Sequence, residues 1–227
     1  ELKEAVEDLD RALALDPDDV IATSNRGTIR VALGDEGGWG DMRRAADLAP
    51  TEPMARYRVA QACFQHGRYA EACDHFDAVL ALAPDQNAWR LGRAWSRVLA
   101  GKRDAALEDL RLVAVDPSLP KAAVWLAALG QRVPGLEAVA RGEPPLRDVA
   151  LYYLGRLDEP GLLSAADAVT NADLRRATRC VARTHLGLAA EARGDAAAAL
   201  GHYRAAVEEG MKEMVEGRWA KGRVASQ

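Results

Sequence analysis

Residues 69–84 read YAEACDHFDAVLALAP, and similar phrases occur three more times along the chain. Residues 4–17 read EAVEDLDRALALDP, residues 104–117 read DAALEDLRLVAVDP, and residues 197–210 read AAALGHYRAAVEEG. The first three of the prolines Pro17, Pro50, Pro84 and Pro117 are each followed 17 residues later by a glycine, and the prolines are spaced by 33, 34 and 33 residues. An internal repeat of this length is typical of stacked helical units.

Each half of the repeat is predicted to be an α-helix. Ala5, Leu9 and Leu13 recur at intervals of four residues and share one helical face, whereas Glu7 and Asp8 lie on another. No segment shows the alternating apolar pattern of a strand. The sequence therefore predicts an all-α protein.

Glycine and proline mark the ends of these helices. A glycine can adopt the left-handed conformation of a helix C-cap, which we expect at Gly34, Gly67, Gly101 and Gly194. A proline prevents the preceding helix from continuing. Side-chain oxygens after the prolines are expected to cap the next helices, at Asp18, Thr51 and Asp85.

With these features the chain resembles the tetratricopeptide repeat (TPR) family. Residues 53–84 match the family pattern most fully, with Val59, Ala60, Gly67, Tyr69, Ala72, Phe76, Val79 and Pro84. Residues 186–206 match almost as well, whereas residues 20–50 and 87–117 match with one-residue deletions and with Gly38 at an alanine position. The resemblance implies a right-handed TPR-like α-solenoid of about five antiparallel helix pairs.

The repeat is predicted to be regular only up to residue 117. Residues 1–117 are expected to form a TPR array whose first repeat has its second helix alone, as part of a longer protein. Residues 118–227 are expected to form an irregular helical region that ends in a TPR-like repeat at 172–210 and a capping helix at 211–224. Helices are expected within the irregular part at 120–130, 134–142, 146–155 and 159–169. We expect both parts to form one continuous solenoid.

The C-terminal part carries two further expectations. In the helix 211–224, Met214 and Trp219 lie on one side and Glu216 and Lys221 on the other, which predicts a cap with Glu216 in solvent. The phrases at 153–155 and 214–220 are also similar to bacterial envelope TPR lipoproteins, although no lipid-attachment cysteine lies near Glu1. That resemblance implies an adaptor and is compatible with a homodimer.

The composition argues against several classes of partner. Lysine and arginine number 30 against 34 aspartates and glutamates, so a net charge of -4 provides no general attraction to nucleic acid. No apolar run approaches the roughly 18 residues of a membrane span, so no membrane insertion is expected. Three cysteines are too few for a disulfide framework, which favours the cytoplasm over the periplasm.

The TPR resemblance implies a concave groove lined by the first helix of each repeat. The residues carried over to that groove are Asn25, Thr28, Tyr57, Arg58, Gln61, Phe64, Leu91 and Trp95. Exposed aromatic side chains in such a groove are typical binding anchors, and the alternative is that Phe64 and Trp95 pack between repeats. One TPR subclass holds a C-terminal carboxylate, but Met54 stands where that clamp has lysine.

Other constellations point weakly to chemistry. Two arginine stripes could contact phosphate, but such stripes more often pair with neighbouring carboxylates; they are Arg90, Arg93 and Arg97, and Arg175, Arg176, Arg179 and Arg183. The spacing of Cys63, His66, Cys73 and His75 matches no common zinc site. The chain lacks GxSxG, P-loop and HExxH motifs. We therefore expect no catalysis, no metal and no cofactor.

The sequence favours a non-catalytic scaffold or adaptor that binds a protein or peptide partner in the groove. An alternative is a regulatory or oligomerisation segment of a larger enzyme, such as a kinase or protease chain, whose catalytic domain lies outside these residues. A hydrolase site within the irregular region is a third alternative, for which the sequence shows no motif.

Overall fold

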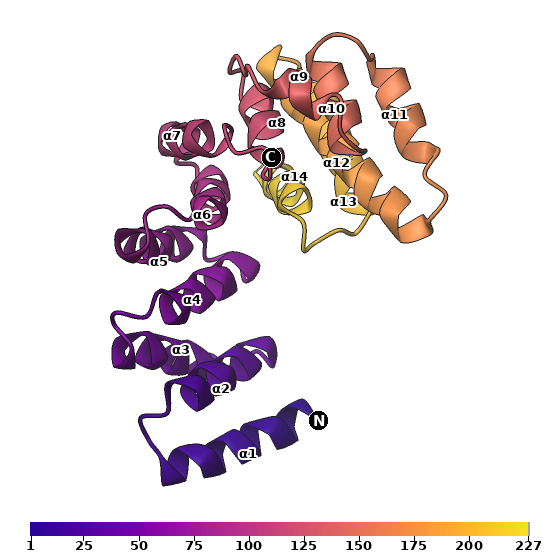
Figure 1. Ribbon diagram of the computed structural model, residues 1–227. Coiled ribbons are helices and arrows are strands. Elements are labelled where there is room, and N and C mark those ends of the chain that lie inside the picture. The colour runs from indigo at the N-terminus through magenta and orange to yellow at the C-terminus, as the bar shows by residue number, and fades with distance from the viewer. Residues whose placement is uncertain (227) are drawn as a thin grey trace. The chain divides into compact units, whose positions relative to one another are not determined.

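The computed structural model describes residues 1–226, and every regular element within that range is an α-helix (Figure 1). The all-α prediction is confirmed. The chain forms two compact units, which we call unit 1 (residues 1–100) and unit 2 (residues 101–227).

Unit 1 is a row of helices in which each helix packs against the next. Its helices are α1 (Leu2–Leu15), α2 (Val20–Ala32), α3 (Gly37–Leu48), α4 (Pro53–Gln65), α5 (Tyr69–Leu82) and α6 (Asn87–Leu99). Helices α2 and α4 also contact each other, as do α4 and α6, so the first helices of successive repeats are neighbours. This is the packing that the repeat predicts.

The core of unit 1 lies between these helix pairs. Trp39, Met42, Val59 and Phe76 are buried in one cluster together with the small residue Ala60. A helix of about 14 residues is marginal in water by itself, so this shared apolar surface stabilises each helix. The stability of every pair therefore depends on its neighbours.

The turns inside the repeats form at the predicted glycines, whereas the N-caps are shifted. Backbone φ is positive at all four, Gly34, Gly67, Gly101 and Gly194. The predicted N-caps at Asp18, Thr51 and Asp85 are wrong, because each helix begins one residue later. Asp19 caps α2 by accepting hydrogen bonds from Ile21 and Ala22, and Glu52 and Gln86 precede α4 and α6 without a side-chain cap.

Helices α2 and α3 approach each other through a pair of glycines. A Cβ atom on Gly38 would lie 2.6 Å from the carbonyl oxygen of Gly27 and 2.7 Å from the backbone nitrogen of Val31. No alanine fits into that space unless the helices separate. The contact explains why Gly38 stands at a position where the family pattern has alanine.

Unit 2 is less regular than unit 1. Its helices are α7 (Arg103–Val113), α8 (Lys121–Ala128), α9 (Leu136–Val139), α10 (Leu146–Tyr153), α11 (Glu159–Asp167), α12 (Ala172–Ala192), α13 (Ala196–Glu208) and α14 (Val215–Ala225). The helix predicted at 134–142 shrinks to the four residues of α9, because Pro134 and Gly135 delay its start. The terminal helix begins at Val215 instead of Met211.

Helix α12 is the centre of unit 2. It packs against α11, α13 and α14 and also reaches α8 (Figure 1). Its buried side chains include Cys180, His185 and Leu186. Because 21 residues form α12, its N-terminal turns extend beyond the length of a usual TPR helix and cover part of the irregular region.

Glu216 is buried, and the prediction that it faces solvent is wrong. Its exposed fraction is 0%, and neither carboxylate oxygen has a hydrogen-bond partner within residues 1–226. The prediction failed because α14 packs against both α12 and α13, so two of its sides are covered.

Candidate functional site

The first helix of each repeat in unit 1 carries four equivalent positions on one face. All four are exposed on α2 and α4, whereas on α6 the first is exposed and the other three are half-buried. They lie at i, i+4, i+7 and i+11, which places them on one face of a helix. The positions are Ile21, Asn25, Thr28 and Ala32 on α2, Met54, Arg58, Gln61 and Gln65 on α4, and Ala88, Gly92, Trp95 and Leu99 on α6. We call this surface the repeat stripe.

The repeat stripe changes in character along the helices. We call the equivalent positions of the three helices a row, so the first row holds Ile21, Met54 and Ala88. This first row is apolar and open to solvent, since Ile21 is 67% and Met54 49% exposed. The second row carries Asn25 and Arg58, and the third carries Thr28, Gln61 and Trp95. Arg58 is the one charged residue of the stripe, and it makes no ion pair within the described residues 1–226. A partner thus meets an apolar edge beside one unpaired guanidinium group.

Four of the eight predicted groove residues lie exposed on the repeat stripe: Asn25, Thr28, Arg58 and Gln61. The hydroxyl of Thr28 donates a hydrogen bond to the carbonyl of Ser24 at 2.9 Å and keeps its lone pairs open to a ligand. Asn25 and Thr28 also line a cavity of about 420 Å³ between α1 and α2. The sequence did not predict that cavity, because its walls depend on how α1 packs.

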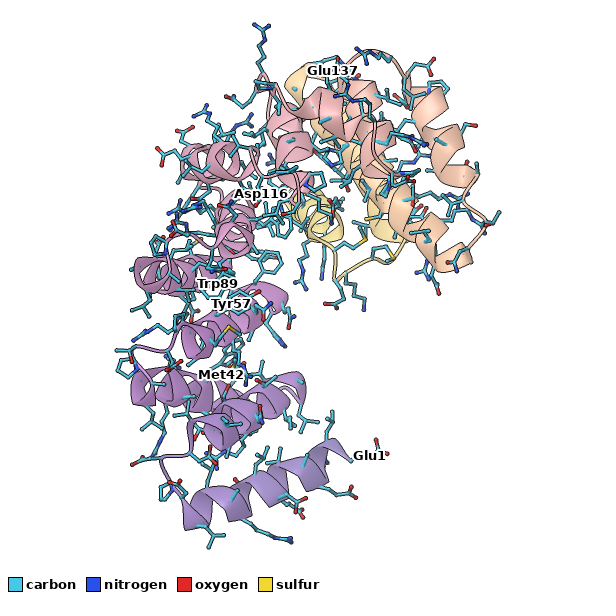
Figure 2. All side chains as sticks on the ribbon, viewed as in Figure 1. Glu1, Met42, Tyr57, Trp89, Asp116 and Glu137 are labelled. Carbon is cyan, nitrogen blue, oxygen red and sulfur yellow. The ribbon has the colours of Figure 1, made fainter. Side chains whose placement is uncertain are left out.

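Tyr57 belongs partly to the core. Its ring stacks on Trp89 of α6, with 5.2 Å between the ring centroids and 29° between the planes (both residues are labelled in Figure 2). Its hydroxyl accepts a hydrogen bond from Gln61 at 2.8 Å, and burial raises the pKa of that hydroxyl. Tyr57 therefore supports Gln61 from below the stripe.

The remaining predicted groove residues differ in burial. Phe64 packs against the core of unit 1 and lies edge-on to Tyr69 at 5.7 Å, which agrees with the packing alternative. Leu91 is only 4% exposed and occupies the position equivalent to Tyr57. Trp95 is half-buried on the third row of the repeat stripe. Of these residues, Trp95 remains a candidate contact residue.

The arginine stripes are largely engaged with other groups. Arg93 and Arg97 both bind the carboxylate of Asp77, at 2.6 and 3.1 Å. Arg179 binds Asp167, and Arg176 donates two hydrogen bonds to the carbonyl of Glu209. The interpretation as faces paired with carboxylates is confirmed for Arg93, Arg97 and Arg179, whereas Arg176 binds a backbone carbonyl.

The cysteine and histidine side chains of α4 and α5, and His66 between these helices, differ in burial. Burial raises the pKa of the Cys63 thiol to about 11, and it lowers the pKa of His75. His66 is exposed and lies edge-on to Trp39 at 5.6 Å. The part of the chain that the structure describes contains no group of three or more histidine, cysteine, aspartate or glutamate side chains placed to hold a metal ion.

Within residues 1–226, no helix has both the length and the hydrophobicity of a membrane span.

The family comparison matches the best-formed repeat. A family model described as tetratricopeptide repeat matches residues 53–86, which contain α4 and α5. This part of the chain is a TPR. The resemblance drawn from the repeat spacing is thereby confirmed for this repeat, and repeats of this kind are typical of scaffolds for protein–protein interaction.

Three known proteins are similar to this chain over different shares of its length. The TPR repeat-containing thioredoxin TTL4 of Arabidopsis thaliana is 29% identical over 100 residues, which are 44% of this chain and 14% of that protein. The chain thus matches only a small part of that relative's length. The crystal structure of PilW, described as a widely conserved type IV pilus biogenesis factor, is 21% identical, with a TM-score of 0.51 over 97% of this chain and 90% of that chain. The crystal structure of MamA is 16% identical, with a TM-score of 0.45 over 93% and 90%. The PilW likeness shows the TPR-like solenoid fold.

Proposed function

We propose that this protein is a non-catalytic adaptor that binds an extended segment of a partner protein along the repeat stripe. The observation that carries this proposal is the exposure of all four equivalent positions on the neighbouring helices α2 and α4, together with that of Ala88 on α6. A segment lying across the three helices would meet an equivalent set of positions once per repeat. Such repetition suits an extended chain better than a compact surface.

The rows of the stripe favour a particular segment. The first row would accept apolar side chains on Ile21 and Met54, and Arg58 in the second row would accept one carboxylate. Asn25 and Gln61 offer amide groups to the backbone of the bound segment. Because Met54 replaces the lysine of the carboxylate clamp, the proposed ligand is an internal acidic and apolar segment instead of a chain terminus.

Affinity capture from the source cell tests this proposal. The double variant Asn25→Ala/Arg58→Glu alters two exposed side chains and should lose the partners that the parent protein captures. Arg204→Glu in unit 2 makes the same charge change on an exposed residue outside the stripe and should retain them. Circular dichroism should show equal helix content in all three proteins. Identical partners for the stripe variant and the control would refute the proposal.

A second candidate is a regulatory or oligomerisation segment of a larger enzyme. One observation favours it: the TPR relative named above is a thioredoxin of which the aligned region covers only 14%. Light scattering of the purified chain tests the oligomerisation part. A monomer at all concentrations would contradict self-association and leave the adaptor proposal intact.

A further inference from the structure

Unit 2 contains a larger cavity that is separate from the repeat stripe. Its volume is about 850 Å³, within the range of roughly 300–1,000 Å³ typical of small-molecule sites. Its walls come from the connection between α7 and α8, from α8 and α9, from the turn at residues 142–146, and from the first half of α12. All of these segments belong to unit 2.

The interior of the cavity offers few hydrogen-bonding groups. Five of the lining residues are prolines, which have no backbone N–H: Pro117, Pro120, Pro134, Pro144 and Pro145. The only lining hydroxyl, on Thr178, donates a hydrogen bond to the carbonyl of Leu174 at 2.8 Å. A peptide backbone inside the cavity would bury N–H groups with few partners, whereas an alkyl chain has none to satisfy.

The helix α12 supplies an apolar wall. Leu174, Ala177 and Val181 line the cavity at intervals of three and four residues, so they share one face of the helix. Leu174 is 54% exposed and continues this apolar face to the surface. The apolar wall therefore extends from the interior of the cavity to its mouth, so a long alkyl chain could lie along it.

Two guanidinium groups at the cavity lack carboxylate partners. Arg111 donates a hydrogen bond to the neutral amide of Gln131 at 2.7 Å, and the adjacent Arg132 is exposed. Neither forms an ion pair within residues 1–226. Of the lining carboxylates, Asp116 accepts two hydrogen bonds from Ser118, and Glu143 is exposed. The arginine pair is thus available to an anion at the mouth.

From this combination we infer that the unit 2 cavity binds a free single-chain amphiphile: an alkyl chain inserts along α12, and an anionic head group meets Arg111 and Arg132. The inference does not depend on the repeat stripe. A partner helix is the competing occupant, and it would cover the mouth without filling the interior.

Titration calorimetry with octanoate and dodecanoate, below their micelle-forming concentrations, tests the inference. One ligand should bind per chain, and each added methylene should tighten Kd about four-fold, equivalent to about 0.8 kcal/mol. Dodecanoate should bind about ten-fold more tightly than dodecan-1-ol. The double variant Arg111→Gln/Arg132→Gln should lose that ten-fold difference and still bind the alcohol. Arg141→Gln, an exposed arginine outside the cavity, should behave as the parent.

Two variants test the location of the alkyl chain. Ala177→Trp fills the interior and Leu174→Trp narrows the outer end of the wall, so both should weaken dodecanoate at least ten-fold; the second alters an exposed position and should leave the fold intact. Absence of saturable binding by the parent would overturn the inference, as would equal binding of dodecanoate and dodecan-1-ol. Binding of an acidic amphipathic helical peptide in place of dodecanoate, lost in Ala177→Trp, would assign the cavity to a protein partner instead.

Discussion

The glycine contact between α2 and α3 gives a prediction whose sign depends on geometry. Alanine is favoured over glycine inside a helix by about 1 kcal/mol, so Gly38→Ala would stabilise α3 if the added methyl group had room. It has none, since the new Cβ atom would lie 2.6 Å from the carbonyl oxygen of Gly27 and 2.9 Å from the Cβ of Arg30. The backbone atoms cannot rotate away, so the steric cost is about 3 kcal/mol, at the upper end for overpacking. The net expectation is a loss of about 2 kcal/mol in the free energy of unfolding.

Gly40 provides the matched control in the same helix. A Cβ atom there would meet nothing within 4 Å, so Gly40→Ala should stabilise the protein by about 0.5–1 kcal/mol. Urea unfolding followed by far-UV circular dichroism measures both variants against the parent. A repeat array can unfold in more than one step, so tryptophan fluorescence serves as a second probe, to which Trp39, Trp89 and Trp95 of unit 1 and two tryptophans of unit 2 contribute. Equal stabilisation by the two alanines would refute the close approach of α2 and α3.

Three further predictions concern buried polar groups. Glu216→Met should raise the free energy of unfolding by about 1–3 kcal/mol, because the buried carboxylate has no hydrogen-bond partner in residues 1–226. The control Glu208→Met, at an exposed position, should change it by less than about 0.5 kcal/mol. A destabilised Glu216→Met would show that the carboxylate is compensated. Burial lowers the pKa of His185 to about 3, so between pH 6.5 and pH 3 the unfolded chain binds a proton at His185 that the folded chain does not bind. As the pH is lowered through this range, the free energy of unfolding should decrease by up to about 1.4 kcal/mol per pH unit because of this group. His185→Phe should remove this contribution to the pH dependence; an unchanged pH dependence would contradict the assignment. Burial raises the pKa of Cys180 to about 12, so iodoacetamide at pH 8 should label it only after unfolding in urea, as mass spectrometry would show; rapid labelling of the folded protein would contradict its burial.

The repeat period predicted unit 1 well because local signals and packing agree there. Glycine positions fixed the turns, and the positions equivalent to Arg58 and Gln61 follow from the period alone. The pattern of one helix cannot show how far a neighbouring side chain reaches, which is why Leu91 was expected in the groove and lies 4% exposed instead. Exposure of Asn25 and Thr28 was predictable, but the cavity beside them was not.

Unit 2 was harder to predict because it departs from the period. Its helices were placed in the right order, but their lengths depend on Pro134 and Gly135 and on the turn before Val215. The burial of Glu216 could not be predicted, since a helix covered on two sides has no single polar face. The cavity of unit 2 arises from segments between residues 111 and 214 and leaves no local motif in the sequence.

The helices of unit 1 make their substantial contacts only with the next helix or the next but one. Chains with such local contacts fold quickly, and their neighbouring units can separate one at a time. If the protein were pulled from its two ends, unit 1 should lengthen in several small steps instead of one large rupture. A tether with that mechanical response can yield under load and recover while part of it stays folded.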